Sequence, residues 1–351
     1  MSEKFTVSKI APSYEAPTFY AKDAMTGLRL MNEIMDPELR EQVLSQHIFR
    51  EVPATTVRPE TVAVPSGERR SPKVRTDIPV PSAPYTDRRV RTVPNLQEVW
   101  SYINPHMLYG RHLGFKGKGG FEKSLADRDP KALELFYNVE EVKREAAEFM
   151  KVRAVWQFFE IERDGNALRV FKPGDARPVE AFQFGRQAKS DGLCLSDYAL
   201  DPRDGKRDHL VLFVVTAGEG VIAHSQAAKE SGEYFRAHAL QALAIETAEA
   251  AAEWLHRRIR EDWGFPDPPT MSMQERFTSR YRGKRYSFGY PACPNLEDQA
   301  KLWRLLRPED IGVHLTEGFM MEPEASVSAL VFHHPDCAYF SAAEETEPAY
   351  V

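Results

Sequence analysis

Hydrophobic residues recur with the period of an α-helix in several parts of the chain. The clearest case is the alanine-rich segment from residue 234 to 262, whose residues have high helix propensity throughout. A second helix is predicted from about residue 130 to 150. A shorter one is predicted over LQEVWSYI, residues 96–103, with Asn95 as its N-cap.

Strand-like segments separate these helices. AVWQFFEI (154–161) and ALRVF (167–171) flank the pair Asp164-Gly165, a pattern that predicts a β-hairpin. The run DHLVLFVVTAG (208–218) is apolar without alternation, which predicts a strand buried on both faces. Because strands and helices do not alternate regularly, we expect an α+β fold, with a mixed or antiparallel central sheet and flanking helices.

The N-terminal part of the chain has a different character. Residues 1–50 predict an arm and two helices, the second starting at Asp36-Pro37 and continuing through LREQVLSQ (39–46). Residues 51–94 are rich in proline and arginine, and proline disfavours both a helix and a central strand. We interpret 51–94 as an extended linker that can lie across another surface. The folded domain is expected to cover residues 95–345.

Composition excludes some classes of function. The 351 residues carry a formal net charge of −6, whereas a nucleic-acid-binding surface needs clustered basic residues. The longest apolar runs are too short to span a bilayer, and the N-terminus has no apolar signal core. We therefore expect no nucleic-acid or membrane partner and a cytoplasmic location. The three cysteines, Cys194, Cys293 and Cys337, have spacings of neither a disulfide framework nor a zinc site.

Acidic residues and a histidine share one face of the long helix: Glu246, Glu249, Glu253 and His256. The Glu-x-x-His spacing within this set occurs in di-iron bundles, but such a bundle needs a second copy, which the chain lacks. A solvated or ion-paired face beside the neighbouring arginines is the favoured interpretation, and no metal site is expected.

Three other motifs have ordinary structural interpretations. His333 and His334 are adjacent in a strand-like run, so they point to opposite faces and favour a structural or surface role. The glycine cluster FKGKGGF (115–121) lacks the ending of a phosphate-binding P-loop and predicts a flexible loop. Cys293 precedes a helix start, yet no histidine can be nominated as its base, so a small buried residue at a turn is expected.

Arg285 precedes the turn Gly289-Tyr290-Pro291. A glycine there permits close approach of the backbone to a ligand, and a guanidinium can bind a carboxylate through two parallel hydrogen bonds. Tyr339-Phe340 could stack on an adenine ring or face a cation. Spacing alone slightly favours the alternative, a surface arginine and an aromatic pair in the core.

Specific strings follow one another in this part of the chain: RYSFGYPACP (285–294), LTE (315–317), SVS (326–328), HPD (334–336) and Tyr339-Phe340. Weaker strings, such as VTAG (215–218) and AEAAAEWLHRRIR (248–260), extend the agreement. With them, the chain from about Leu96 to Phe340 resembles the activation domain of cobalamin-dependent methionine synthase.

The resemblance implies a fold and a reaction. Members of that family bind S-adenosylmethionine and partner the cobalamin-binding module of the enzyme. When the cofactor is oxidised to cob(II)alamin, a flavodoxin- or ferredoxin-type donor supplies one electron. S-adenosylmethionine then supplies a methyl group, which regenerates methylcobalamin, so the domain is expected to act as a methyltransferase.

The resemblance also implies roles for individual residues. Arg285 would hold the carboxylate of the ligand, and Tyr339 and Phe340 would lie at the ligand site, partly through their backbone. Tyr290 would face the corrin ring of the docked module. Asn104 falls where members of the family can have an aspartate that contacts the ligand, so weaker pairing with the ligand's ammonium is expected.

The N-terminal segment 19–35 is similar to the last helical segment of the cobalamin-binding module, but the Asp-x-His-x-x-Gly signature of that module is absent. We expect an activation protein, separately encoded or a C-terminal fragment, that acts in trans on a cobalamin-carrying partner. Two alternatives remain: a non-catalytic docking or capping subunit, and reactivation of a different corrinoid protein.

Overall fold

The computed structural model describes residues 6, 11, 16–21, 24–37, 39–44, 69–188, 191–202 and 205–342. The chain divides into two compact units, Met1–Ala63 and Val64–Val351. In the first unit, α2 (Ala24–Met35) and α3 (Arg40–Leu44) are helical. The α3 helix begins later than Asp36-Pro37 predicts, after a turn in which the Asp36 carbonyl accepts from Arg40 N at 2.9 Å. The expected continuation of α3 to residue 46 lies outside the described residues.

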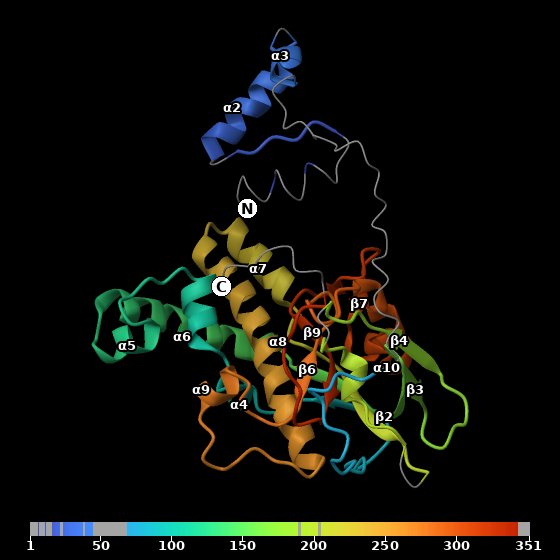
Figure 1. Ribbon diagram of the computed structural model, residues 1–351. Helices are drawn as coiled ribbons and strands as arrows, with labels where there is room; N and C mark the ends of the chain where they lie inside the picture. Colours follow the sequence, from blue (N-terminus) through green and yellow to red (C-terminus); the bar gives the residue numbers. More distant parts are fainter. Residues whose placement is uncertain are drawn as a thin grey trace. The chain divides into compact units, whose positions relative to one another are not determined.

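The second unit is built on an antiparallel sheet (Figure 1). Within the described residues this sheet has seven strands, in the order β4-β3-β2-β5-β9-β6, with β1 paired to β2. The strands are β1 (Arg89–Thr92), β2 (Arg153–Asp164), β3 (Ala167–Phe171), β4 (Glu180–Gln183), β5 (Asp208–Thr216), β6 (Lys284–Tyr286) and β9 (Ser326–Phe332). A separate hairpin joins β7 (His314–Leu315) to β8 (Met321–Glu322). The predicted α+β class and antiparallel sheet are confirmed.

The predicted hairpin and the buried strand are both present. Asp164 of β2 pairs with Ala167 of β3 across the expected turn. Alternate residues of β5 belong to two different hydrophobic clusters, one on each face of the sheet. The continuous apolar run is therefore explained, because β5 has no face towards solvent.

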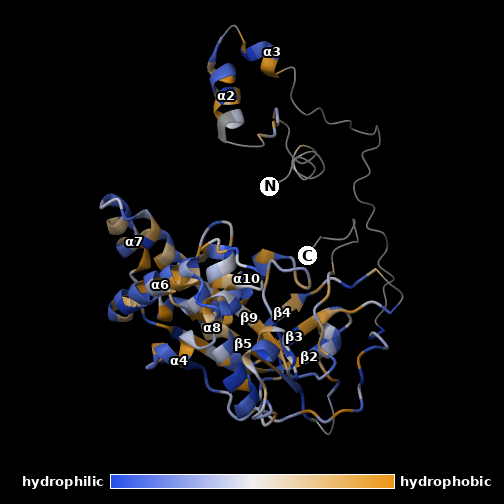
Figure 2. Cartoon of the chain, turned by 90° about the vertical axis from the view of Figure 1, so that its left-hand side faces the viewer, coloured by the Kyte–Doolittle hydropathy of each residue, from blue (hydrophilic) through white to orange (hydrophobic). Residues whose placement is uncertain are grey.

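Helices cover one face of the sheet and shorter elements cover the other. The long helix α8 (Tyr234–Asp262) packs on β5 and β9, and α4 and α6 pack against it. The other elements of this layer are α4 (Leu96–Trp100), η3 (His106–His112), α5 (Phe121–Ala126), α6 (Pro130–Phe149), α7 (Val221–Glu230) and α9 (Met273–Phe277). The opposite face carries η4 (Leu195–Tyr198), η5 (Leu296–Asp298), α10 (Gln299–Leu306) and η6 (Pro308–Ile311). Figure 2 shows hydrophobic colour on the strands between these layers.

Local caps explain where two of these helices begin. The Asn95 side chain accepts from Glu98 N at 3.2 Å, so the predicted N-cap of α4 is confirmed. Asp129 accepts from Lys131 N and Ala132 N, and Pro130 occupies the first position of α6. Each cap satisfies backbone donors that have no partner inside the helix.

The sequence predicts that the folded domain starts at residue 95. In the structure, residues before 95 already belong to the folded unit. Strand β1 pairs with β2 from Arg89 opposite Trp156 to Thr92 opposite Arg153. Further upstream, the backbone N of Ser71 donates to Asp197. These tertiary contacts fix residues from the predicted 51–94 linker onto the domain, which local composition cannot reveal; residues 51–68 lie outside the described part. None of the described helices has the length and apolar character needed to cross a membrane.

Candidate ligand-binding site

Arg285 is placed by the register of the edge strand β6. It lies opposite Val331 of β9, and Tyr286 lies opposite Leu330. Since side chains alternate along a strand, Tyr286 and Leu330 enter the cluster on the α10 face while Val331 enters the cluster on the α8 face. Arg285 therefore points to α8, and its side chain is 19% exposed.

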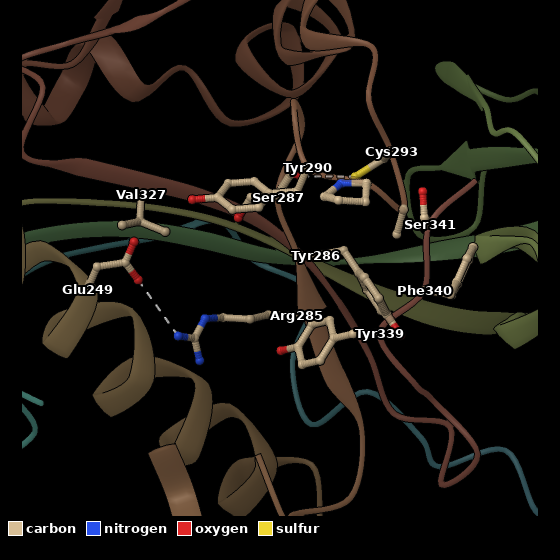
Figure 3. Close-up of a pocket in the computed structure, with 12 residues that line it drawn as sticks. Glu249, Arg285, Tyr286, Ser287, Tyr290, Cys293, Val327, Tyr339, Phe340 and Ser341 are labelled. Carbon is tan, nitrogen blue, oxygen red and sulfur yellow. Dashed lines mark hydrogen bonds and ion pairs between the residues drawn. The ribbon is translucent and has the colours of Figure 1, made fainter. Parts of the chain in front are cut away.

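The partners of Arg285 lie on α8 and just before β6. Glu253 forms a close ion pair with its Nη1, and the Tyr281 hydroxyl donates to Glu253 at 2.9 Å. Glu249 lies 3.9 Å from Nη2 and points towards the guanidinium (Figure 3). Burial is the largest single influence and lowers the pKa of Arg285, but the charge of Glu253, together with smaller contributions from Tyr281, Tyr339 and Glu249, raises the pKa overall. The side chain is a permanent, oriented cation.

A cavity of about 580 Å³ opens beside Arg285. Its walls come from residues 285–287, 290–293 and 339–341, together with Glu249 and Val327. Figure 3 shows Arg285 between Glu249 and the Tyr339 ring, with Phe340 and Ser341 farther along the same wall. The cavity thus brings together the arginine, the turn and the aromatic pair that the sequence pattern singles out.

The Gly289 turn forms one wall of this cavity. Gly289 has a φ of 85° and donates its N–H to the Cys293 carbonyl at 3.0 Å, while Cys293 N donates to Tyr290 O at 2.9 Å. This left-handed conformation favours glycine. Gly289 is not among the lining residues, so in this structure it shapes the turn that carries Tyr290. Tyr290 lines the cavity and is 63% exposed.

Two buried tyrosines fix the segment that carries the aromatic pair. The hydroxyls of Tyr286 and Tyr198 donate to the Ala338 carbonyl at 2.8 and 3.4 Å. Tyr339 follows directly, and its ring packs edge-on against Tyr286 at 5.6 Å between centroids. Phe340 packs partly against the core. The backbone of this segment is therefore held firmly where it faces the cavity.

A second cavity, of about 290 Å³, adjoins the first and shares Arg285 and Glu249 with it. Its polar lining residues include Asn104, His112, Glu246, Glu253, Arg276 and Ser279. Asn104 Oδ1 accepts from His106 N at 3.0 Å in the turn that starts η3. The amide N–H groups of Asn104 remain as donors for this cavity.

Most of the acidic face of α8 is turned inward, and of its four residues only Glu249 is exposed. Glu246 and Glu253 are buried. Glu253 forms an ion pair with Arg285, which agrees with the ion-paired face that the sequence predicts as one of two possibilities. His256 is fully buried, and burial followed by the charges of nearby cations lowers its pKa well below the ordinary value. Among the described residues, no group of three or more His, Cys, Asp or Glu could hold a metal ion.

The remaining candidates have structural roles. Cys293 is buried at its turn as predicted, and burial raises its pKa to about 12, so it is not a thiolate. His333 Nε2 lies 2.8 Å from Asp208 Oδ1, and His334 Nε2 lies 2.9 Å from the Arg75 carbonyl. Both histidines are buried, which agrees with a structural role and excludes a surface one.

The sequence pattern did not identify Glu249 as a residue of the candidate site. The helical spacing of three and four grouped it with its neighbours, but that spacing cannot show which face meets a cavity. Only the tertiary structure, which places Arg285 of β6 beside Glu249 and Glu253 of α8, brings Glu249 to both cavities.

Comparisons with known proteins agree with this architecture. Residues 95–347 match the family model of the vitamin B12 dependent methionine synthase activation domain. The chain is 28% identical to methionine synthase of Mycobacterium tuberculosis (strain ATCC 25618 / H37Rv) over 372 residues, covering 97% of this chain and 31% of that protein. Methionine synthase of Mycobacterium leprae (strain TN) is 28% identical over 373 residues, with the same coverage. The chain spans about a third of the length of these curated relatives, 31% in each case.

A solved structure shares the fold. The crystal structure of the MetH reactivation domain bound to AdoHcy aligns with a TM-score of 0.70 and 28% identity, over 76% of this chain and 85% of that one. The fold that the resemblance implies is therefore confirmed. Since the family model covers most of the chain, this protein belongs to the family of vitamin B12 dependent methionine synthase activation domains.

Proposed function

We propose that this protein binds S-adenosylmethionine across the two adjoining cavities and presents its methyl group to a cobalamin-carrying module of methionine synthase. Such a reaction would reactivate the oxidised enzyme and needs an external one-electron donor of flavodoxin or ferredoxin type. The observation that carries the proposal is the position of Arg285, where the two cavities meet beside Tyr339. The solved relative binds AdoHcy, the demethylated product of this donor.

The cavities suit the two ends of such a ligand. The smaller one offers the Arg285 guanidinium and the Asn104 amide to a carboxylate. The larger one offers the Tyr339 and Phe340 segment and the turn at Pro291 to an adenosine group. A ligand that spans both would place its sulfonium near the shared residues Arg285 and Glu249, where the Glu249 carboxylate offsets the positive charge.

The chemistry asks for positioning rather than for a nucleophile in this chain. S-adenosylmethionine carries a methyl group already activated on sulfur, which the reduced cobalt of a docked module would accept. The protonated Cys293 thiol next to the ligand space would not compete for the methyl group. Fixed walls around Arg285 would hold the donor in one orientation.

Tyr290 is the proposed contact to the partner. Its residue is 63% exposed at the mouth of the larger cavity. An aromatic ring in this position can pack against the flat corrin of a docked module while the ligand remains beneath it.

Isothermal titration calorimetry with S-adenosylmethionine tests ligand binding. Arg285→Ala should weaken binding by about tenfold to a hundredfold, because it removes charge-assisted hydrogen bonds. Arg304→Ala is the matched control: Arg304 is on α10, its side chain is 61% exposed, and it pairs with Glu180 away from both cavities. Equal affinity of the wild type and Arg285→Ala would contradict the assigned role.

A reactivation assay tests the reaction. The protein, a cob(II)alamin-loaded partner, S-adenosylmethionine and a reductant should together give the absorbance spectrum of methylcobalamin. Tyr290→Ala should slow this change by a larger factor than it weakens the calorimetric affinity, because its exposed ring faces the docked module. Binding to the partner without affinity for the ligand would instead indicate the docking subunit considered above.

A further inference from the structure

Glu246 is a buried carboxylate on the wall of the smaller cavity. Its side chain is 4% exposed, and His112 Nε2 lies 2.9 Å from its Oε1. Within the described ranges, no lysine or arginine forms an ion pair with Glu246. Glu253 lies about two helical turns further along α8 and lines the same cavity. It is paired with Arg285 and Arg260.

His112 does not compensate the charge. Burial, followed by the repulsion of His238, lowers the pKa of His112, so its ring is neutral at neutral pH. The neutral ring supplies one hydrogen bond and no charge. Burial, followed by the charge of Glu249, raises the pKa of Glu246 to about 7. A carboxylate in this state gains most from a cation that enters the cavity.

The other polar groups of the cavity already have partners or are donors. Arg276 Nε pairs with Asp267 Oδ2 at 3.2 Å. Arg285 is a cation, and Asn104 has its side-chain oxygen engaged in the turn before η3. These groups suit a ligand carboxylate, whereas an ammonium needs an acceptor of negative charge. Glu246 and Glu249 supply that charge, and Glu249 is 48% exposed, so solvent screens it more strongly.

We propose that Glu246 is the specificity-determining residue for the ammonium group at the amino-acid end of the ligand. This inference rests on the proposed function, because the ligand must enter the smaller cavity by that end. Glu246 binds the ammonium while Arg285 and Asn104 bind the carboxylate, so the cavity selects a zwitterionic α-amino acid group over an acid without the amine.

A double-mutant-type cycle tests this pairing: the amine of the ligand and the charge of Glu246 are removed separately and together. S-adenosylhomocysteine and its analogue without the amino group are titrated by calorimetry into the wild type, Glu246→Gln, Glu249→Gln and, as a control, Glu141→Gln on α6. Loss of the amine should weaken binding to the wild type and the control by about tenfold or more, as expected for a charged hydrogen bond. In Glu246→Gln the same loss should cost less than about threefold, since the charge is already absent.

The outcomes separate the inference from the proposed function. One outcome is that the wild type binds S-adenosylhomocysteine and loses the same factor in affinity as Glu246→Gln when the amine is removed. In that case the inference is wrong and the proposed function stands. If the effect disappears in Glu249→Gln but persists in Glu246→Gln, Glu249 is the ammonium partner and the inference is also wrong. A wild type that binds neither ligand contradicts the proposed function and the inference with it.

Proton linkage gives a second readout that a merely structural role would not change. The titratable groups beside Glu246 are the neutral His112 on η3 and the carboxylate of Glu249 on α8, and the cavity also holds Glu253, Arg276 and Arg285. An ammonium beside Glu246 favours its ionised form, so binding near pH 6.5 should release a proton. Calorimetry in two buffers of different ionisation enthalpy should detect this release in the wild type and not in Glu246→Gln. Identical proton release in both would overturn the assignment.

Discussion

The carboxylate of Glu253 on α8 forms an ion pair with the guanidinium of Arg285 on β6, two residues that are 32 positions apart in the sequence. Glu253 also accepts from the Tyr281 hydroxyl and lies 3.6 Å from Arg260 Nη2. Arg260 in turn donates twice to Asp267, at 2.7 and 2.8 Å. The cation of the proposed ligand site is thus the outer end of a buried ionic network.

Glu253→Gln should destabilise the protein by about 3 kcal/mol, because removing one partner of a buried ion pair leaves the other uncompensated. Urea unfolding followed by circular dichroism measures this free energy. Glu141→Gln, whose side chain is 70% exposed on α6, should change it by less than about 0.5 kcal/mol. Equal stability of the two variants would show that the network does not hold Arg285.

Gly283→Ala should lower both stability and ligand affinity. Gly283 has a φ of 73°, and an added Cβ would lie 2.4 Å from the Phe332 carbonyl oxygen, which forces β6 away from β9 and displaces Arg285. The expected loss is about 2–4 kcal/mol, from the left-handed backbone and the overlap together.

Gly174→Ala is the control for the strain of a left-handed backbone without any overlap of the added Cβ. Gly174 has a φ of 78°, with nothing within 4 Å of an added Cβ. Its loss should be about 1–2 kcal/mol, with ligand affinity unchanged. If the two alanine variants behave alike in unfolding and calorimetry, the close contact between β6 and β9 is not what positions Arg285.

Glu246 should make the stability of the unliganded protein fall as the pH rises. Its folded pKa of about 7 lies above its ordinary value of 4.5, so the folded state binds more protons between these values. Its contribution to stability is fully present below about pH 4.5 and is lost as the pH rises through about 7. In denaturant unfolding, Glu246→Gln should therefore gain stability over the wild type at pH 8 relative to pH 5. A difference between the two proteins that does not change with pH would contradict the raised pKa.

Cys293→Ser should bind S-adenosylmethionine within about threefold of the wild type. The Cys293 Sγ lies 2.9 Å from the Ser287 carbonyl oxygen, a bond that a serine hydroxyl can also donate. Calorimetry measures the affinity. A loss greater than tenfold would give the thiol a direct role at the ligand that its burial and raised pKa do not predict.

Much of the fold follows from local sequence. The limits of α8, the hairpin at Asp164 and the Asn95 cap are set by neighbours within a few residues, and the structure confirms them. The grouping of Arg285 with Tyr290 and Tyr339 is supported by the family strings. Spacing alone left that grouping open, because those residues lie on a strand, a turn and a loop whose distances depend on tertiary packing.

The sequence by itself determined α6, α8, the start of α4, the buried strand and the identity of the chemical groups, because periodicity, caps and turn residues act over short distances. Tertiary structure alone decided which of these groups meet. The β6–β9 register turned Arg285 towards α8, and α8 brought Glu249 and Glu253 to it. The pairing of β1 with β2 likewise moved part of the expected linker into the domain. Such contacts depend on backbone hydrogen bonds and burial between distant segments, which no local pattern in the chain records.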